Sequence, residues 1–333
     1  MRFSVRFNND LPVRAYPALA RAAEDAGFDQ FWVSDDLFLR SVWVILTGVA
    51  QATNRIGIGT GIVNPYTMHP AEMAMAAGAL DELSDGRLCL GLSSGAADFL
   101  SWVGIPAERP VGAVVETVEA LRRLFGGAPP RHDGTFLQGW TSEAYMRFPT
   151  RQVPIYIGAM SPAMLRAVGR VGDGGLPLVF PPEHFASALG YIQEGLVESN
   201  RSLDQVDVAA CIWCSVDSDR TAAENALRDK VGYYGHALSP TILEALGVDR
   251  AEFEPIRKAI MVERDARAAR AMVTQAMLRI GVVGTASDLI PRLEGLVNMG
   301  ARHLSFGPPL GPDPLAAIQL LGRQVLPYFR GAV

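Results

Sequence analysis

Charged residues and glycines stand at the ends of several short apolar runs, where they could reach a common ligand. Arg6 ends the first run, and Asp35 and Asp36 follow the second. After the third comes the stretch GIGTGIVNPYTMHP, residues 57–70, in which Gly59 and Gly61 lack side chains where a flat ligand or another backbone must come close. This stretch could form one wall of a cofactor pocket, or it could be an ordinary strand-to-helix connection whose glycines serve only turns.

The loops after the apolar runs hold few pairs of a nucleophile and a base. No His stands beside a Ser or Cys there, so hydrolysis by a Ser/His/Asp triad is disfavoured. Glycines, small hydroxyls and few acids suit a cofactor that carries out the chemistry while the protein orients it. The backbone N–H groups of residues 158–161, ahead of a helix that begins near Pro162, form a predicted anion site. A simple N-cap by Ser161 is the alternative, and the two roles can coexist.

These loops are positioned by a regular alternation of apolar strands and amphipathic helices. Strands are predicted at 2–7, 28–34, 55–61, 87–92, 154–159, 175–180, 206–216 and 303–306. Helices are predicted between them, and mostly helical sequence runs from 219 to 279. A doubly wound sheet is disfavoured, because the first strand is followed by FNND and not by a glycine-rich GxGxxG turn.

Eight such units predict an α/β protein with a (β/α)8 TIM-barrel fold. We expect a single domain over residues 1–333, with insertions at about 126–153 and, after strand seven, at about 236–279. Active-site groups of such barrels lie in the loops that directly follow the strands. The fold therefore predicts that the polar residues described above meet at one end of the barrel.

The composition narrows the classes of partner. The formal net charge is -5, and no Lys- or Arg-rich cluster is interleaved with aromatic residues, so we expect no nucleic-acid partner. No run of about 18 apolar residues occurs, which predicts a soluble, cytoplasmic protein without membrane contact that acts on a small molecule. Cys211 and Cys214 are three positions apart in a predicted strand and would face opposite sides, so no metal site is expected.

Several ordered motifs resemble the bacterial-luciferase-like superfamily. They include GTGIVNPYTMHP, DELSDGRLCLGL, PIYIGAMSPAML, VGDGGLPLV and VVGTASDLIPRLEGLVNMG, and the resemblance extends from Met1 to Pro327. Within the superfamily the sequence is most similar to methylenetetrahydromethanopterin reductases, which use coenzyme F420. This resemblance implies a (β/α)8 barrel, a homodimer formed through early helices, and a deazaflavin or FMN bound at the C-terminal mouth of the barrel.

The resemblance also implies roles for individual residues. Asp35 would lie near the polar head of the deazaflavin ring, and the Gly61–Ile62 bond would be a non-prolyl cis peptide behind the ring. Residues 158–160 and 175–178 would line the side chain and phosphate of the cofactor. The full set of predicted cofactor contacts is Asp35, Thr60, Gly61, Ile62, Asn64, Ser93, Gly158, Ala159, Met160, Gly175, Leu176, Pro177 and Leu178.

The sequence departs from the reductase pattern at the substrate side. In the reductases a Glu stands near the end of strand one, a His follows the Asp after strand two, an acid follows GxGPG after strand four, and a Gln stands in a GAQGP loop. Arg6, Asp36, Ala96 and Met160 occupy these places here. The pterin-binding half of the site is therefore not retained.

These departures predict an F420-dependent oxidoreductase that transfers a hydride to or from a small substrate other than tetrahydromethanopterin. Arg6, Asp35 and Asp36 are the predicted catalytic residues: Arg6 could engage a carboxylate or another acceptor, and Asp36 could give or take the accompanying proton. Alternatively, Arg6 forms a salt bridge with Asp35 or Asp36, and Asp36 is an exposed loop acid. Two other functions stay open, an FMN-dependent luciferase-like monooxygenase and a non-catalytic cofactor-binding protein.

Overall fold

Within residues 1–131 and 133–331, which the computed structural model describes, nine parallel strands form the sheet, and eight of them close into a barrel, as predicted. The barrel strands are β1 (Arg2–Phe7), β2 (Gln30–Val33), β3 (Gly57–Thr60), β4 (Leu88–Leu92), β5 (Ile155–Ala159), β6 (Gly174–Pro177), β7 (Asp207–Val216) and β9 (His303–Leu310). Because β6 pairs with β7, β7 with β9 and β9 with β1, the barrel is closed and has no open edge.

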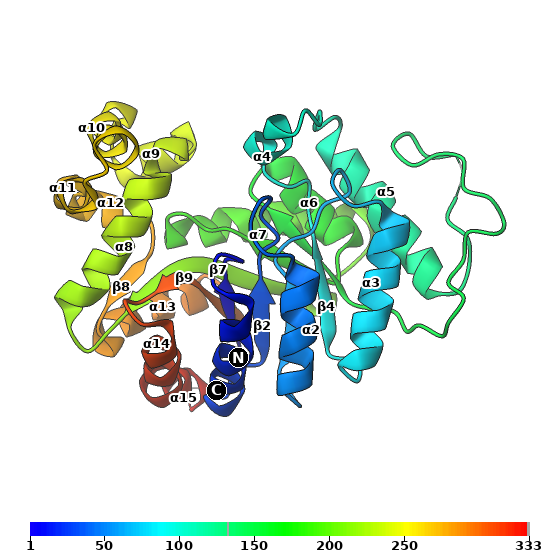
Figure 1. Cartoon of the computed structure of the whole chain (residues 1–333), viewed down its shortest axis with the longest axis horizontal. Coiled ribbons are helices and arrows are strands. Elements are labelled where there is room, and N and C mark those ends of the chain that lie inside the picture. The colour runs from blue at the N-terminus through cyan, green and yellow to red at the C-terminus, as the bar shows by residue number, and fades with distance from the viewer. Residues whose placement is uncertain (132, 332–333) are drawn as a thin grey trace.

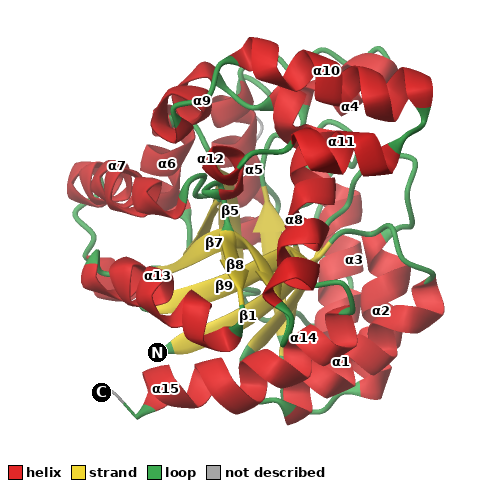
Figure 2. Cartoon of the chain, turned by 90° about the vertical axis from the view of Figure 1, so that its left-hand side faces the viewer, coloured by secondary structure: helices red, strands yellow, loops and turns green. Residues whose placement is uncertain are grey.

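Helices surround the barrel on the outside (Figures 1 and 2). They are α1 (Tyr16–Asp25), α2 (Val42–Ala52), α3 (Pro70–Leu83), α5 (Pro110–Phe125), α6 (Pro162–Val171), α7 (Phe185–Glu198), α8 (Arg220–Tyr234), α13 (Ala286–Asn298), α14 (Pro314–Leu320) and α15 (Leu326–Arg330). Helix α4 (Ala97–Trp102) lies instead at the mouth of the barrel. Several of the surrounding helices begin at a proline, whose fixed φ suits the first helical turn, as Pro70 does in α3.

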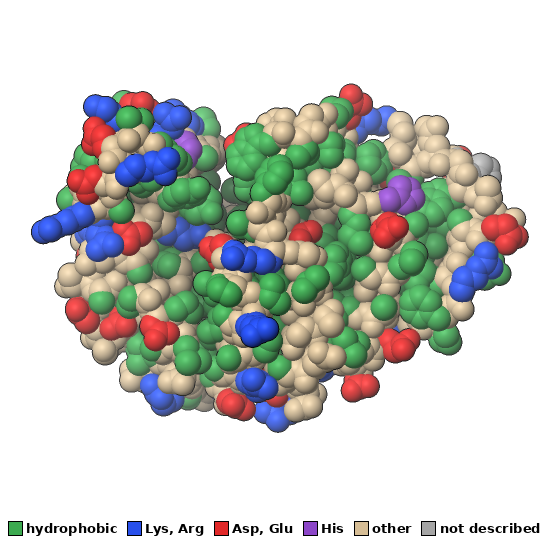
Figure 3. Space-filling view, viewed as in Figure 1, with side chains coloured by type: hydrophobic (Ala, Val, Ile, Leu, Met, Phe, Trp, Pro, Cys, Tyr) green, Lys and Arg blue, Asp and Glu red, His purple; other side chains and the backbone are tan. Residues whose placement is uncertain are grey.

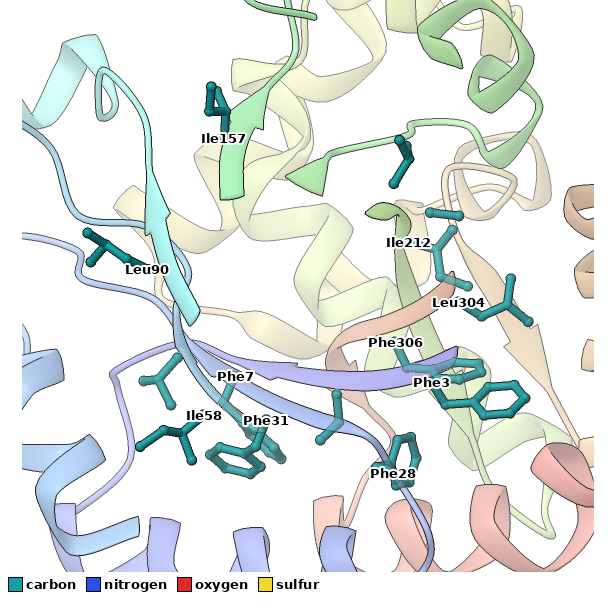
Figure 4. Close-up of a cluster of buried hydrophobic side chains, with 14 of the residues drawn as sticks. Phe3, Phe7, Phe28, Phe31, Ile58, Leu90, Ile157, Ile212, Leu304 and Phe306 are labelled. Atoms are coloured by element: carbon teal, nitrogen blue, oxygen red, sulfur yellow. The ribbon is translucent and has the colours of Figure 1, made fainter. Parts of the chain in front are cut away.

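Side chains alternate between the two faces of each strand and so form two apolar clusters, one outside the barrel and one inside it. Outward side chains such as Phe3, Phe31, Ile58 and Leu90 pack in the large cluster between the barrel and its helices (Figure 4). Inward side chains form a smaller cluster inside the barrel, made of Trp32, Tyr156, Leu176, Ala209 and Cys211. Successive side chains of a strand point to opposite faces of the sheet. A predicted site residue on a strand can therefore line the barrel interior only if it stands at an inward-facing position, here called the inward phase.

The helical segment after β7 forms a lobe beside the mouth of the barrel. Its elements after α8 are α9 (Pro240–Leu246), α10 (Phe253–Lys258), α11 (Ala266–Met272) and α12 (Gln275–Leu278). The lobe has its own apolar cluster, which includes Leu227 and Val231 of α8 and reaches the barrel through Trp213 and Phe180. Figure 3 shows the surface hollowed between this lobe and α4. The other expected insertion, 126–153, has no helix or strand among its described residues.

Some predicted elements differ from those observed. The short strand β8 (Val282–Gly284) pairs with the end of β7 and was not predicted, because three residues before a helix cap resemble a loop. Helix α4 was also not predicted. Cys211 lies in the interior cluster and Cys214 in the outer one, so the two thiols do face opposite sides of β7. No helix in the described part of the chain combines the length and the apolarity that crossing a membrane requires.

Candidate functional site

A cavity of about 460 Å³ opens at the C-terminal ends of the strands. Loops after β2, β3, β4 and β5 contribute most of its wall, which agrees with the general position of active sites in such barrels. The lining residues are Arg6, Asp35, Asp36, Leu37, Gly61, Ile62, Asn64, Ser93, Ser94, Gly95, Ala96, Phe99, Leu100, Pro110, Val111, Gly158, Ala159, Met160, Ser161, Met164, Leu176 and Leu178.

The structure brings most of the predicted site residues together in this cavity, but three lie outside its lining. Thr60 is fully buried, and its hydroxyl bonds to Gly91 O and accepts from Gly91 N, each at 2.9 Å. Gly175 and Pro177 have the outward phase of β6, whereas Leu176 and Leu178 have the inward phase and line the cavity. A prediction that takes four consecutive strand residues as contacts must therefore place about half of them on the wrong face.

Gly61 and Ile62 form the back wall of the cavity. The peptide bond between them is cis, as the sequence resemblance implied. Ile62 and Ser93 pack closely against β5 because Gly158 has no side chain. A Cβ on Gly158 would lie only 3.0 Å from Ile62 Cγ2 and 3.3 Å from Ser93 Cβ. Gly59, by contrast, only makes room for the indole of Trp32, from which a Cβ would lie 2.1 Å.

Two hydrogen bonds order the polar part of this wall. The Ser93 hydroxyl donates to Gly158 O at 2.7 Å and so joins the ends of β4 and β5. Asn64 Oδ1 accepts from the backbone N–H groups of Tyr66 and Thr67 at 3.1 and 3.0 Å. The carbonyl oxygen of the Asn64 amide is thus bonded within the protein, and Asn64 lines the cavity with its NH2 group as the remaining donor of the side chain.

Helix α6 begins at the far side of the cavity. Ser161 is its N-cap and accepts from Met164 N at 3.3 Å, so the capping role is confirmed. Pro162 takes the first helical position, where its missing N–H is not needed. The N-terminus of a ten-residue helix still offers unpaired N–H groups and a partial positive charge to the cavity, so an anion site here stays a prediction.

Asp35 and Asp36 both have a raised pKa. Burial raises the pKa of Asp35. The backbone N–H of Val42 donates to its Oδ1 at 3.2 Å, and this hydrogen bond lowers the pKa by a smaller amount. Burial is also the main cause for Asp36; the Ser34 hydroxyl and the charge of Lys230 lower its pKa, and the carboxylates of Asp35 and Asp10 raise it. Asp36 is therefore half-buried in the cavity wall and is not an exposed loop acid. A carboxyl group with a raised pKa holds its proton more readily than an ordinary one, as a proton donor must.

Arg6 is not paired with either of these acids. Its Nε donates to Ser305 Oγ at 3.1 Å, and its Nη2 donates to Ile212 O at 2.8 Å. Among the ion pairs of residues 1–131 and 133–331, none includes Arg6. The alternative in which Arg6 forms a salt bridge with Asp35 or Asp36 is thus wrong, and Arg6 lines the cavity without a carboxylate partner among the described residues.

Part of the site was missed in the sequence. Phe99 and Leu100 come from α4, and Pro110 and Val111 from the first turn of α5. The apolar spacing of Phe99, Leu100 and Trp102 was the available signal, but six residues are too few for a reliable helical period. Lys230 of α8 does not line the cavity, but its charge acts on Asp36; its ammonium lies 4.5 Å from the centre of the Tyr234 ring, and burial lowers its pKa to about 8.

No group of three His, Cys, Asp or Glu side chains is arranged to hold a metal ion in the described residues. The site instead consists of backbone N–H groups, small hydroxyls, an amide, two carboxyls and one guanidinium around an apolar wall. This combination can orient a large planar ligand and hold a proton beside it.

The chain matches a known protein family and several of its relatives. Residues 2–303 match the luciferase-like monooxygenase family. The chain is 34% identical to 5,10-methylenetetrahydromethanopterin reductase of Archaeoglobus fulgidus, covering 99% of this chain and 100% of the relative. It is 29% identical to F420-dependent glucose-6-phosphate dehydrogenase of Nakamurella multipartita, covering 95% and 92%. The coenzyme F420 dependent tetrahydromethanopterin reductase from Methanopyrus kandleri superimposes with a TM-score of 0.92 at 30% identity, over 98% of this chain and 99% of the other.

Proposed function

The chain belongs to the luciferase-like monooxygenase family, and we propose that it is an F420-dependent oxidoreductase that transfers a hydride between the deazaflavin and a small organic substrate. The observation that carries this proposal is the cavity wall of Gly61, Ile62, Ser93 and Gly158. Two proteins named for coenzyme F420, the glucose-6-phosphate dehydrogenase of Nakamurella multipartita and the reductase from Methanopyrus kandleri, match over 95% and 98% of this chain.

The residues of the cavity fit a deazaflavin. Ile62, Ala159 and Leu176 present an apolar surface to a flat ring, and the lack of a side chain at Gly158 keeps that surface open. The N-terminus of α6 suits the phosphate of the cofactor. When bound, coenzyme F420 supplies the hydride or accepts it; the protein supplies binding, orientation and the proton.

Asp36 and Arg6 are the proposed substrate-side residues. Asp36 holds a proton more firmly than an ordinary carboxyl and lines the cavity, so it can protonate or deprotonate the substrate atom next to the reacting carbon. Asp35 lies beside it and holds the first turn of α2 through Val42. Arg6 replaces an acid of the reductase pattern with a permanent cation, which disfavours a pterin that the acid would bind. We therefore propose a substrate other than tetrahydromethanopterin.

A cofactor titration separates the three candidate functions. We expect coenzyme F420 to bind with micromolar affinity or better, seen as a change in deazaflavin fluorescence, and reduced F420 to be oxidised by at least one of a panel of ketones, imines and unsaturated acids. Tight binding of FMN without binding of coenzyme F420 would show a monooxygenase instead. Binding without turnover of any substrate would favour a non-catalytic protein, and turnover of methylenetetrahydromethanopterin would refute the substrate proposal.

We also propose a homodimer formed through α2 and α3. Val44 of α2 is 59% exposed and Met75 of α3 is 55% exposed, and large apolar side chains on neighbouring helices favour association. Figure 3 shows hydrophobic side chains on the face where these helices lie. Light scattering should give twice the chain mass of 35.8 kDa, and replacing both side chains by Asp should return the mass to that of one chain. A single-chain mass for the wild type would contradict this proposal.

A further inference from the structure

A line of polar side chains runs through the interior of the barrel and ends at Arg6. Asp207 Oδ2 lies 3.0 Å from His303 Nδ1, and His303 Nε2 lies 2.8 Å from Ser4 Oγ. The Ser4 hydroxyl donates to Ser305 Oγ at 2.8 Å, and Ser305 Oγ also accepts from Arg6 Nε. Ser4, His303 and Ser305 are all 0% exposed. The line therefore connects the N-terminal end of the barrel with the cavity at its C-terminal end.

The register of three neighbouring strands explains this line. Arg2 pairs with His303 and Ser4 with Ser305 across β1 and β9, and Cys211 of β7 pairs with Ser305. Positions two apart share a face, so Ser4 and Arg6 of β1 form an inward column beside His303 and Ser305 of β9. Each step along this column moves one layer closer to the cavity.

The next inward position of β9 is Gly307, and its lack of a side chain makes room for Arg6. A Cβ there would lie 2.3 Å from Arg6 Nη2. The guanidinium is thus held on two sides, by Ser305 at Nε and by the carbonyl of Ile212 at Nη2. Five N–H donors belong to a guanidinium, and those left over are available to the cavity that Arg6 lines.

Stability alone does not account for this arrangement. Buried polar groups cost free energy unless every one is hydrogen-bonded, and well-packed apolar side chains of similar volume are often more stable. An arginine held in one orientation, without a carboxylate to neutralise it, loses little side-chain entropy when an anion binds. Such a group is suited to planar, two-pronged recognition of an oxyanion.

We propose that His303, Ser4 and Ser305 are positioning residues that hold Arg6 ready to bind an oxyanion of the substrate, a carboxylate or a phosphate group. This inference builds on the proposed oxidoreductase function and specifies its substrate class. It depends on the contacts of Arg6 and not on which cofactor fills the rest of the cavity.

Arginine side-chain NMR tests the proposal without knowledge of the substrate. The Nε–Hε signal of Arg6 is identified by its loss in Arg6→Lys, and the protein is titrated with acetate and with inorganic phosphate, first alone and then with coenzyme F420. We expect the signal of the wild type to shift with at least one anion. In Ser305→Ala the anion affinity should fall about tenfold, and in Ser4→Ala, which does not touch Arg6, about threefold.

Ser215→Ala is the matched control. Ser215 is also fully buried in β7, but its hydroxyl donates to Ala223 O at 2.7 Å and is not part of the line. Its variant should bind the anion as the wild type does. Phosphate alone shifting the signal would indicate a phosphate ester as substrate, and acetate alone a carboxylic acid.

The proposal fails if neither anion shifts the Arg6 signal of the wild type. It also fails if Ser305→Ala, folded as judged by its circular dichroism, binds the anion as tightly as the wild type. Anion binding at Arg6 in a protein that does not bind coenzyme F420 would support this inference while refuting the cofactor proposal, so the two failures are distinguishable.

Discussion

Replacing Gly158 by valine should abolish the binding of coenzyme F420 to the folded protein. A Cβ at this position already meets Ile62 and Ser93 at the limit of contact, and the two methyl groups of valine would extend further into the cofactor wall. We expect the dissociation constant to rise more than about a hundredfold, since a blocked wall cannot accept a rigid ring. The measurement is a fluorescence titration of the deazaflavin.

Gly190→Val is the control for this substitution. Gly190 lies in α7, and nothing lies within 4 Å of a Cβ built on it. This variant should bind the cofactor normally and melt near the wild-type temperature. Wild-type affinity in Gly158→Val would show that the cofactor does not lie against β5 and would refute the assigned position of the ring.

Replacing Asp207 by asparagine should destabilise the fold by about 3 kcal/mol near neutral pH, because it removes one partner of a buried charged network. Tyr156 donates to Asp207 Oδ2 at 2.8 Å, and Arg2 and His303 contact the same oxygen. Burial alone would raise the pKa of Asp207, but the hydrogen bond and charge of the His303 ring, with Arg2 and Tyr156, hold that pKa well below its usual range.

The pH dependence of this loss has a defined sign. A carboxyl whose pKa is lower in the folded state stabilises the protein above the unfolded-state pKa of Asp, and this contribution disappears as the pH falls through the lower, folded-state value. Urea unfolding should therefore show the full difference between variant and wild type at pH of about 7 and about 5, and a smaller one below about pH 3. A difference that does not depend on pH would show that packing and not charge holds this end of the barrel.

Asp25→Asn is the matched control, since Asp25 ends α1 as an exposed carboxylate. Its free energy of unfolding should stay within about 0.5 kcal/mol of the wild type at every pH, as is usual for a surface substitution. A loss in this variant equal to that of Asp207→Asn would indicate a general effect of net charge.

Local signals in the sequence predicted the barrel and most of its mouth. Pro70 and Pro162 indicated helix starts, and strong apolar runs indicated the barrel strands, because these signals act over a few neighbouring residues. The short elements β8 and α4 lack enough residues for a periodic pattern. Gly175 and Pro177 could not be assigned correctly without the strand phase, which depends on where pairing begins and ends.

The line behind Arg6 could not have been predicted in this way. Its members are far apart in the chain, and single serines and a histidine in apolar strands carry no pattern of their own. Only closure of the barrel, which pairs β9 with β1 and with β7, brings Ser4, Asp207 and His303 together. Contacts of this kind depend on tertiary register and not on local propensity.

The separate apolar cluster of the lobe after β7 has an evolutionary consequence. Its side chains pack mainly on one another and meet the barrel through a few residues such as Trp213 and Phe180. Trp213 of β7 belongs to this cluster and Leu178 of the cavity packs against it, but Gly61, Ile62, Ser93 and Gly158 of the cofactor wall do not belong to it, so substitutions on the lobe surface facing the hollow leave these four residues unchanged. The surface of the lobe can therefore vary without a matching change in the wall of Gly61, Ile62, Ser93 and Gly158, as is general where variable segments surround a rigid scaffold.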